Sequence, residues 1–421
     1  MNAPVIGFGR AMAVVFAPFA CGYFFSYLYR TVNAVVAPDL RADTGVGAAE
    51  LGLLTSTYFI AFAAAQLPLG VLLDRFGPRR VQACLYAVAA LGALVFALAD
   101  GLIALMCGRA LIGLGVSGGL MASLKAIVQW FPAKRVPLVN GWFLANGGLG
   151  AMASTRPVEF ALAFTDWRGV FVALAVGTLL VAALIWWIVP DKPGGRTSSL
   201  GEQIAALGDI ARDRVFWAVV PLMATCSSSN MAIQGLWAGP WLSEVNGLPR
   251  DRLADILLLV AASFAVGSAL SGALSGWLNR LIGLSLKDYV ILGCVAYVAP
   301  QVLIVLLPDL TIVAPLWIWF GLTSTVNVLA FAVLARHFPE SQIGRANTAA
   351  NVLVFAMAAG YQFGLGVIIA QWPQNEAGQY PVEAYQVAFW AAIVTQVVAI
   401  VWALSQRRLT DRLLAASADT T

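Results

Sequence analysis

Charge is scarce in this sequence of 421 residues: Asp, Glu, Lys and Arg together make up 11% of it, whereas hydrophobic residues make up 60%. Soluble domains carry about 25% charged residues. The composition therefore excludes an ordinary soluble domain and indicates a protein that crosses a lipid bilayer many times. The net charge of +4 is small, and we predict no nucleic-acid partner.

Groups that carry out chemistry are also few. The sequence has a single histidine, His337, and five cysteines that stand one at a time in apolar runs. Without a CxxC pair or a second histidine, the residues predict neither a disulfide framework nor a metal site. No GxxxxGK[ST] loop is present, so no nucleotide-driven step is predicted. Because no nucleophile–base pair is visible either, we predict that the protein is not an enzyme and uses no cofactor.

Long apolar runs are what the sequence has in abundance. A helix needs about 20 apolar residues to cross the hydrocarbon core, and runs bounded by charge, Pro or Gly give twelve candidate spans. Their predicted ranges are 11–39, 49–73, 79–99, 102–131, 136–164, 168–189, 215–243, 252–279, 288–307, 310–336, 343–372 and 382–406.

The longest polar interval lies between the sixth and seventh spans. It divides the chain into a predicted six-helix bundle at 1–189, a central cytoplasmic loop at 190–214, a second six-helix bundle at 215–406 and a cytoplasmic tail at 407–421. Of the 25 Lys and Arg residues, this topology places 17 on the side of the N-terminus, 4 on the opposite side and 4 within spans. The positive-inside rule then predicts cytoplasmic termini, in what we take to be a bacterial inner membrane.

The two halves are related in sequence. WFPAKRVPLVNG at 130–141 matches HFPESQIGRANT at 337–348 at an offset of 207, and GVLLDRFG at 70–77 matches GWLNRLIG at 276–283 at an offset of 206. Repeats of this kind are typical of transporters built from two similar bundles. The predicted fold is therefore all-α and polytopic, with twelve transmembrane helices in two six-helix pseudo-repeats.

Two motifs make a family resemblance specific. GVLLDRFGPRR at 70–80 resembles the signature loop of the major facilitator superfamily, and RALIGLGVSGG at 109–119 resembles that superfamily's span-four motif. The matching residues of the loop are Gly70, Asp74, Arg75, Gly77, Arg79 and Arg80. Charges at helix ends can form charge-assisted bonds in one conformation and break them in another. We interpret this loop as part of a gate; the alternative is that its basic residues only fix the topology.

Four cations lie within predicted spans, where burial costs at least about 3 kcal/mol each. Lys125 lies near the inner end of its span and can extend to the interface. Arg30, Arg109 and Arg156 lie at one depth, about 10–13 Å below the outer boundary, which predicts an aqueous cavity that takes an anion. Arg109 has a structural role as its alternative, and Arg156 can pair instead with Glu159. Glu159 is our candidate for proton coupling.

The segment around Arg30 is the most informative. Tyr23, Tyr27 and Arg30 are spaced i, i+4, i+7, which places them on one helix face. GYFFSYLYRTVNAVVAPDL at 22–40 resembles span one of the organophosphate:phosphate antiporters and the anion:cation symporters. The resemblance implies that these three residues bind the anionic head of a substrate; a tie between helices is the alternative. Those antiporters carry a lysine where this chain has Gln66, so we assign Gln66 to the site and favour a carboxylate over a phosphate ester.

The second half offers neutral polar groups. Asn230, Gln234 and Trp237 lie in span seven, and Asn351 and Tyr361 lie in span eleven. Such groups are costly to leave in lipid, so we predict that they face the substrate, with helix-to-helix hydrogen bonding as the alternative.

The sequence thus predicts a monomeric secondary transporter that carries a small organic anion across the lipid bilayer by alternating access. We expect import coupled to protons, with anion exchange as one alternative. Another is a drug or siderophore exporter of the same fold, which would favour an acidic or apolar cavity. The lack of a sizeable soluble domain argues against a third hypothesis, a membrane receptor that does not transport.

Overall fold

The structure is a computed structural model that describes residues 7–191, 201, 208–308 and 312–418. Within these residues every regular element is a helix, as expected in lipid, where each backbone N–H and C=O must find a partner inside the protein. The chain divides into two compact units, Met1–Val46 with Thr57–Leu200 and Gly47–Ser56 with Gly201–Thr421.

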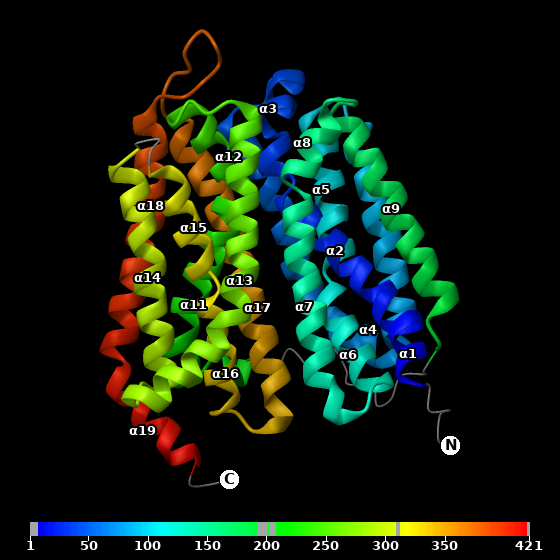
Figure 1. Ribbon diagram of the computed structural model, residues 1–421, viewed down its shortest axis with the longest axis vertical. Coiled ribbons are helices and arrows are strands. Elements are labelled where there is room, and N and C mark those ends of the chain that lie inside the picture. The colour runs from blue at the N-terminus through cyan, green and yellow to red at the C-terminus, as the bar shows by residue number, and fades with distance from the viewer. Residues whose placement is uncertain (1–6, 192–200, 202–207, 309–311, 419–421) are drawn as a thin grey trace. The chain divides into compact units, whose positions relative to one another are not determined.

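The helices of the first unit share one long direction (Figure 1). They are α1 (Phe8–Ala11), the π-helix η1 (Met12–Phe16), α2 (Ala17–Thr31), α3 (Asn33–Thr44), α4 (Ala48–Ala97), α5 (Leu102–Val116), α6 (Gly119–Trp130), the 3₁₀-helix η2 (Ala133–Arg135), α7 (Val136–Ala153), α8 (Arg156–Leu162) and α9 (Trp167–Ile188). The first turns of α4 group with the second unit.

The second unit is built in the same way from longer and shorter helical pieces. They are α11 (Arg214–Ala232), the π-helix η3 (Ile233–Trp237), α12 (Ala238–Pro240), the π-helix η4 (Trp241–Val245), α13 (Arg250–Ile282), α14 (Leu286–Leu306), α15 (Val313–Thr323), the 3₁₀-helix η5 (Val326–Leu329), α16 (Ala330–Ala335), α17 (Glu340–Ile369), α18 (Val382–Ser405) and α19 (Arg407–Ala418).

Contacts at the two ends of the first unit show that the chain crosses it six times. At one end, α1 contacts η2, the segment around Gly77 contacts α6, and the same segment contacts the end of α9. The contacts are Phe8 with Arg135, Asp74 with Lys125, Arg79 with Trp186, and Arg80 with Asp191. The other end joins α3, α4 and α9: Arg168 with Asp43, Ala97 and Ala99. The chain therefore alternates between ends from α1 to Asp191.

The second unit shows the same alternation. One end is closed by Asp213 with His337, Lys287 with Asp411, and Asp288 with Arg407. The other end is closed by Glu244 with Tyr380 and Asn246 with Pro308. Six further crossings follow, so the predicted all-α fold of twelve spans in two halves is confirmed.

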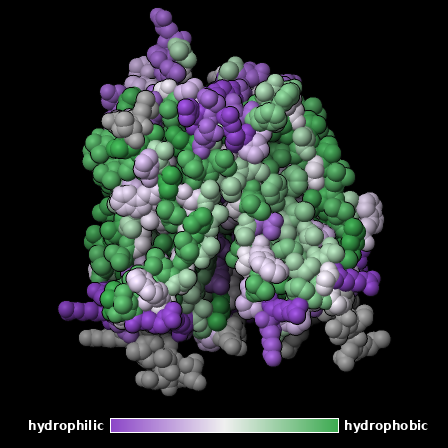
Figure 2. Space-filling view, viewed as in Figure 1, coloured by the Kyte–Doolittle hydropathy of each residue, from purple (hydrophilic) through white to green (hydrophobic). Residues whose placement is uncertain are grey.

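Among the described residues, ten helices are long and apolar enough to cross a membrane. One of them, Ala48–Ala97, has 50 residues and supplies two crossings, because Gly77 departs from helical geometry at φ 77° and ψ 162°. The fifth crossing, α7 with α8, is missing from the ten because Asn140 and Asn146 make α7 more polar. On the face shown in Figure 2, apolar side chains cover the middle of the surface and polar side chains gather toward the ends, as a bilayer requires.

Short breaks interrupt spans one, four, five and ten, and none of them is predicted from the sequence. The fourth span breaks at Ser117, between α5 and α6, and the tenth breaks at Ser324, between α15 and η5. The two serines are 207 residues apart, the offset of the sequence repeat. Each donates its hydroxyl to a carbonyl three residues earlier, Ser117 to Leu114 at 2.7 Å and Ser324 to Gly321 at 2.8 Å. The repeat therefore extends to the geometry of the breaks.

Candidate functional site

A row of two tyrosines and one arginine runs along α2. The rings of Tyr23 and Tyr27 are 5.1 Å apart between centroids, and the guanidinium carbon of Arg30 lies 4.7 Å from the Tyr27 centroid. The three side chains therefore share one helix face, as their spacing predicts. Gly147 of α7 makes room for them, because a Cβ there would lie 2.8 Å from the ring of Tyr23 and 2.9 Å from that of Tyr27.

Two residues of α4 complete the surroundings of Arg30. The ring of Phe62 lies 5.6 Å from the guanidinium carbon, and Tyr58 lies one turn before Phe62 on α4. Arg30 itself is half-buried. Aromatic faces attract a cation at such distances. Sequence reasoning missed both residues, although Tyr58, Phe62 and Gln66 follow one another at four-residue spacing on one face of α4.

Arg109, in contrast, is enclosed. Its residue is 1% exposed, and its guanidinium carbon lies 5.4 Å from the centroid of Phe96 and 5.8 Å from that of Phe171. Its Nη1 donates to the Tyr29 carbonyl at 3.3 Å. Tyr29 lies just before the break between α2 and α3, where regular helical bonding is interrupted. Arg109 therefore supports the backbone beside Arg30.

The break in span five lies beside the break in span one. The hydroxyls of Thr31 and Ser154 are hydrogen-bonded at 2.7 Å, and both residues are buried. Arg156, two residues after Ser154, is exposed, and Glu159 is half-buried. Because Thr31 follows Arg30 directly, this bond brings Arg30 and Arg156 to the same level of the first unit.

Gln66 is occupied by a backbone group. Its residue is 5% exposed, and its Nε2 donates to the Ser117 carbonyl at 3.2 Å. Ser117 marks the break in span four, so this amide satisfies a carbonyl that the broken helix leaves open.

The predicted gate loop ties three helices of the first unit together. Asp74 accepts from the Lys125 ammonium at 2.5 Å, and the same ammonium donates to the Leu73 carbonyl at 2.9 Å. Arg79 donates from Nε to the Trp186 carbonyl at 2.9 Å, near the end of α9, where a cation is favoured. Gly77 forms the turn, and Gly70 lies one turn before Asp74 on α4. The other two arginines are exposed: Arg80 bonds Asp191 at 2.6 Å, and the guanidinium carbon of Arg75 lies 5.1 Å from the centroid of the Phe76 ring.

The second unit brings together part of the predicted polar set. Asn230 donates to Gln234 at 3.4 Å, and both are buried. Trp237 ends the π-helix η3 and is 1% exposed. Asn351 is half-buried on α17. Tyr361 is set apart, because its hydroxyl bonds Thr395 of α18.

A further polar pair of the second unit joins two spans. Ser227 donates to the Asn327 side chain at 2.5 Å, which links α11 to the break in span ten. Among the described residues, no three His, Cys, Asp or Glu side chains are grouped so that they could hold a metal ion.

Comparison with known proteins identifies the family to which this fold and these motifs belong. Residues 19–360 match the Major Facilitator Superfamily. The chain is 25% identical to the "Probable sulfoacetate transporter" of Cupriavidus necator over 62% of its own length and 64% of that protein. It is 24% identical to the hexuronate transporter of Escherichia coli over 66% of its length and 69% of that protein.

Solved structures agree on the fold. A bacterial homologue of the human lysosomal transporter Spinster superposes with a TM-score of 0.76 at 18% identity, over 99% of both chains. The D-xylose–proton symporter superposes with a TM-score of 0.72 at 15% identity, over 93% of this chain and 97% of that one. The protein therefore belongs to the Major Facilitator Superfamily, as a multi-pass transporter of the inner membrane and not an enzyme.

Proposed function

We propose that this protein transports a small organic anion by alternating access and that Arg30 holds the anionic group. The observation that carries the proposal is the half-buried Arg30 beside the rings of Tyr27 and Phe62 within a membrane span. A guanidinium binds a carboxylate or sulfonate through two parallel N–H bonds, and tyrosine hydroxyls can bond its remaining lone pairs. Relatives named as transporters of sulfoacetate and of hexuronate support an organic anion.

A singly charged head group fits the first unit better than a phosphate ester. Arg109 is enclosed by rings and engaged by the Tyr29 carbonyl, so we do not assign it to the head group, and Arg30 is the arginine that we assign to it. Gln66 adds no charge and is engaged by Ser117. We therefore favour a carboxylate or sulfonate.

Ligand binding tests the proposal directly. A ligand at about 100 times its Kd raises the free energy of unfolding by about 2.7 kcal/mol, so thermal unfolding in detergent can compare sulfoacetate, a hexuronate, a phosphate ester and a cationic drug. Arg30→Lys keeps the charge and loses the paired N–H geometry. Arg80→Lys is the matched control, since its arginine pairs with Asp191 in the charged loop. We expect an anion to stabilise the wild type and Arg80→Lys but not Arg30→Lys.

Two results would contradict this assignment. Equal stabilisation of Arg30→Lys would make Arg30 a structural tie. Stabilisation by the cationic drug alone would favour the exporter alternative, for which a relative named as a quinolone resistance transporter is 27% identical over 40% of this chain.

We further propose that import is coupled to protons through Glu159, which lies three residues after Arg156. In proteoliposomes, an inward proton gradient should drive accumulation by the wild type, whereas Glu159→Gln should retain only exchange of internal for external substrate. Gradient-driven accumulation by Glu159→Gln would show that another group carries the proton, whereas a wild type that exchanges substrate but does not accumulate it under the gradient would show that transport is pure exchange.

A further inference from the structure

A cavity of about 310 Å³ lies between α17 and α18 of the second unit. Its lining includes Met357, Gly360, Tyr361 and Gly364 of α17, and Ala391 and Thr395 of α18. The cavity belongs to one unit and is not part of the site around Arg30.

Two glycines keep this space open. A Cβ added at Gly360 or Gly364 would meet no atom within 4 Å. Gly366, on the same helix, shows the opposite case, because a Cβ there would lie 3.2 Å from the ring of Trp237. Gly360 and Gly364 therefore do not serve close packing within this chain; their missing side chains create the cavity.

The chemistry of the wall selects a hydrocarbon ligand. Tyr361 and Thr395 are the polar side chains of the lining, and their hydroxyls are hydrogen-bonded to each other. The cavity is open to the protein surface rather than sealed, and its volume is large enough for a hydrocarbon segment. Apart from that hydroxyl pair its lining is apolar, so it offers little to hold water.

The surroundings indicate where that hydrocarbon comes from. Both helices are membrane spans, and neighbouring apolar side chains are exposed, with Phe363 at 42% and Val394 at 56%. Exposed apolar groups on membrane spans face lipid. We propose that the cavity between α17 and α18 is a lipid site that holds one acyl chain of a membrane phospholipid.

Photolabelling tests this proposal. The full-length protein is reconstituted in phosphatidylcholine that contains a trace of phosphatidylcholine with a diazirine in the middle of one acyl chain, and labelled peptides are mapped after irradiation. We expect labelling to concentrate at 357–368 and 391–395. Filling the cavity by Gly360→Leu with Gly364→Leu should reduce that labelling to the level of other lipid-exposed helices.

A matched control is available on α13. Gly272 and Gly276 have the same spacing, and a Cβ at either would also meet no atom within 4 Å. Gly272→Leu with Gly276→Leu should leave labelling at α17 and α18 unchanged. Leucine is a better helix former than glycine, so both double variants should fold. Gly364→Leu alone, with a smaller loss of labelling, serves if the double variant is unstable.

Three results would overturn the proposal. Uniform labelling of all lipid-exposed helices would mean bulk lipid without a site. Unchanged labelling in the filled variant would place the acyl chain elsewhere. A wild-type dimer that the filled variant loses would assign the surface to a second copy, because glycines four residues apart also form helix-pairing surfaces in membranes.

Discussion

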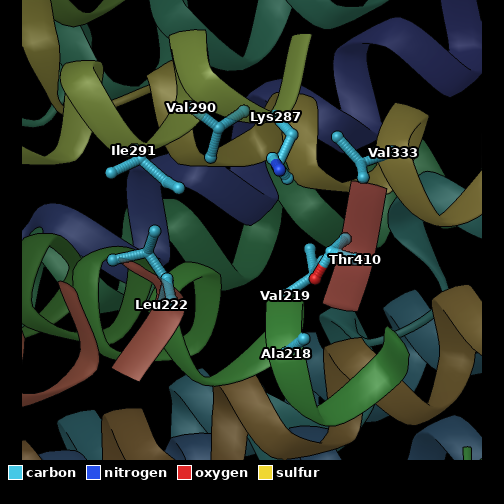
Figure 3. Close-up of a pocket in the computed structure, with 9 residues that line it drawn as sticks. Ala218, Val219, Leu222, Lys287, Val290, Ile291, Val333 and Thr410 are labelled. Carbon is cyan, nitrogen blue, oxygen red and sulfur yellow. The ribbon is translucent and has the colours of Figure 1, made fainter. Parts of the chain in front are cut away.

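Removing the charge of Asp411 should destabilise the protein, because the buried ammonium of Lys287 would lose the carboxylate that it pairs with. Lys287, at the start of α14, is 7% exposed. Its ammonium lies 2.5 Å from the Asp411 carboxylate of α19, 2.9 Å from the Arg407 carbonyl and 4.0 Å from the Asp288 carboxylate. Figure 3 shows Lys287 and Thr410 at a small cavity that side chains of α11, α14 and α16 also line. Asp411→Asn would leave the ammonium without its closest anion.

The magnitude follows from burial. Removing one member of a fully buried ion pair costs about 3–5 kcal/mol. Asp411 is 56% exposed on its side chain, so water already screens the pair, and the Arg407 carbonyl still accepts from Lys287. The cavity of about 20 Å³ beside Lys287 can hold one water molecule. A hydrogen bond to a charged group contributes about 1.5–3 kcal/mol, so we expect a loss of about 1–2 kcal/mol in the free energy of unfolding.

The neighbouring pair should persist in this variant. Asp288 accepts from Arg407 at 2.9 Å, and this hydrogen bond, together with the negative charge of Asp288, raises the pKa of Arg407. The pair holds α19 in place, so the effect of Asp411→Asn should report on Lys287 and not on detachment of the helix.

Asp191→Asn is the matched control. It removes the same charge from a pair of similar length, 2.6 Å, whose cation Arg80 is 57% exposed on its side chain. Exposed pairs contribute about 0–1 kcal/mol. The assay is reversible unfolding in detergent by added dodecyl sulfate, followed by circular dichroism. Equal losses for the two variants would refute the argument that burial of Lys287 sets the cost.

Comparing Lys287→Met with Asp411→Asn shows whether the cost comes from leaving a buried charge unpaired or from the number of bonds lost. Lys287→Met removes the buried member, and Asp411 stays solvated at the surface, so the expected loss is under about 1 kcal/mol. If each contact contributed a fixed energy, Lys287→Met would cost at least as much as Asp411→Asn, because it removes more bonds. A larger loss for Lys287→Met would therefore contradict the desolvation argument.

Two further predictions concern helix packing and helix breaks, each measured as the free energy of unfolding in the same assay. Gly113→Ala would place a Cβ closer than 3.0 Å to the Tyr58 carbonyl and should cost about 1–3 kcal/mol. The control Gly141→Ala, whose Cβ would meet no atom within 4 Å, should be neutral or gain up to about 1 kcal/mol. Equal effects of the two variants would contradict the close approach at Gly113. Gln66→Leu leaves the Ser117 carbonyl open and should cost about 1 kcal/mol; no loss would show that the break does not need this donor.

The spans and their topology could be predicted because they are local properties. Apolar length decides whether a segment crosses the bilayer, and the distribution of Lys and Arg decides its direction. The row of Tyr23, Tyr27 and Arg30 was equally predictable, since it depends only on spacing within one helix. The division of the chain into domains at 190–214 stays a prediction, because most of that segment lies outside the described residues.

The partners of the site residues could not be predicted, because they come from distant parts of the chain. Arg109 bonds a carbonyl 80 residues away, and Gln66 bonds one 51 residues away. Composition shows that a buried cation needs a partner, but it does not show which carbonyl a break leaves open. The sequence therefore led to a prediction of three arginines at one depth, whereas the structure distinguishes an enclosed Arg109 from a half-buried Arg30 and an exposed Arg156.

In the two copies of the repeat, different side chains donate a hydrogen bond to the backbone carbonyl at the helix break. In the first, the Ser117 carbonyl accepts from Gln66 of a neighbouring span at 3.2 Å. In the second, the equivalent Ser324 carbonyl accepts from Asn327 of its own span at 2.8 Å, and Asn327 is in turn held by Ser227. A helix break within lipid needs new partners for the backbone groups that it frees, and side chains are one source of them. The two halves therefore share the geometry of the break but not the side chain that donates to its open carbonyl. The residues around the break can differ between the halves, as Gln66 and Asn327 do.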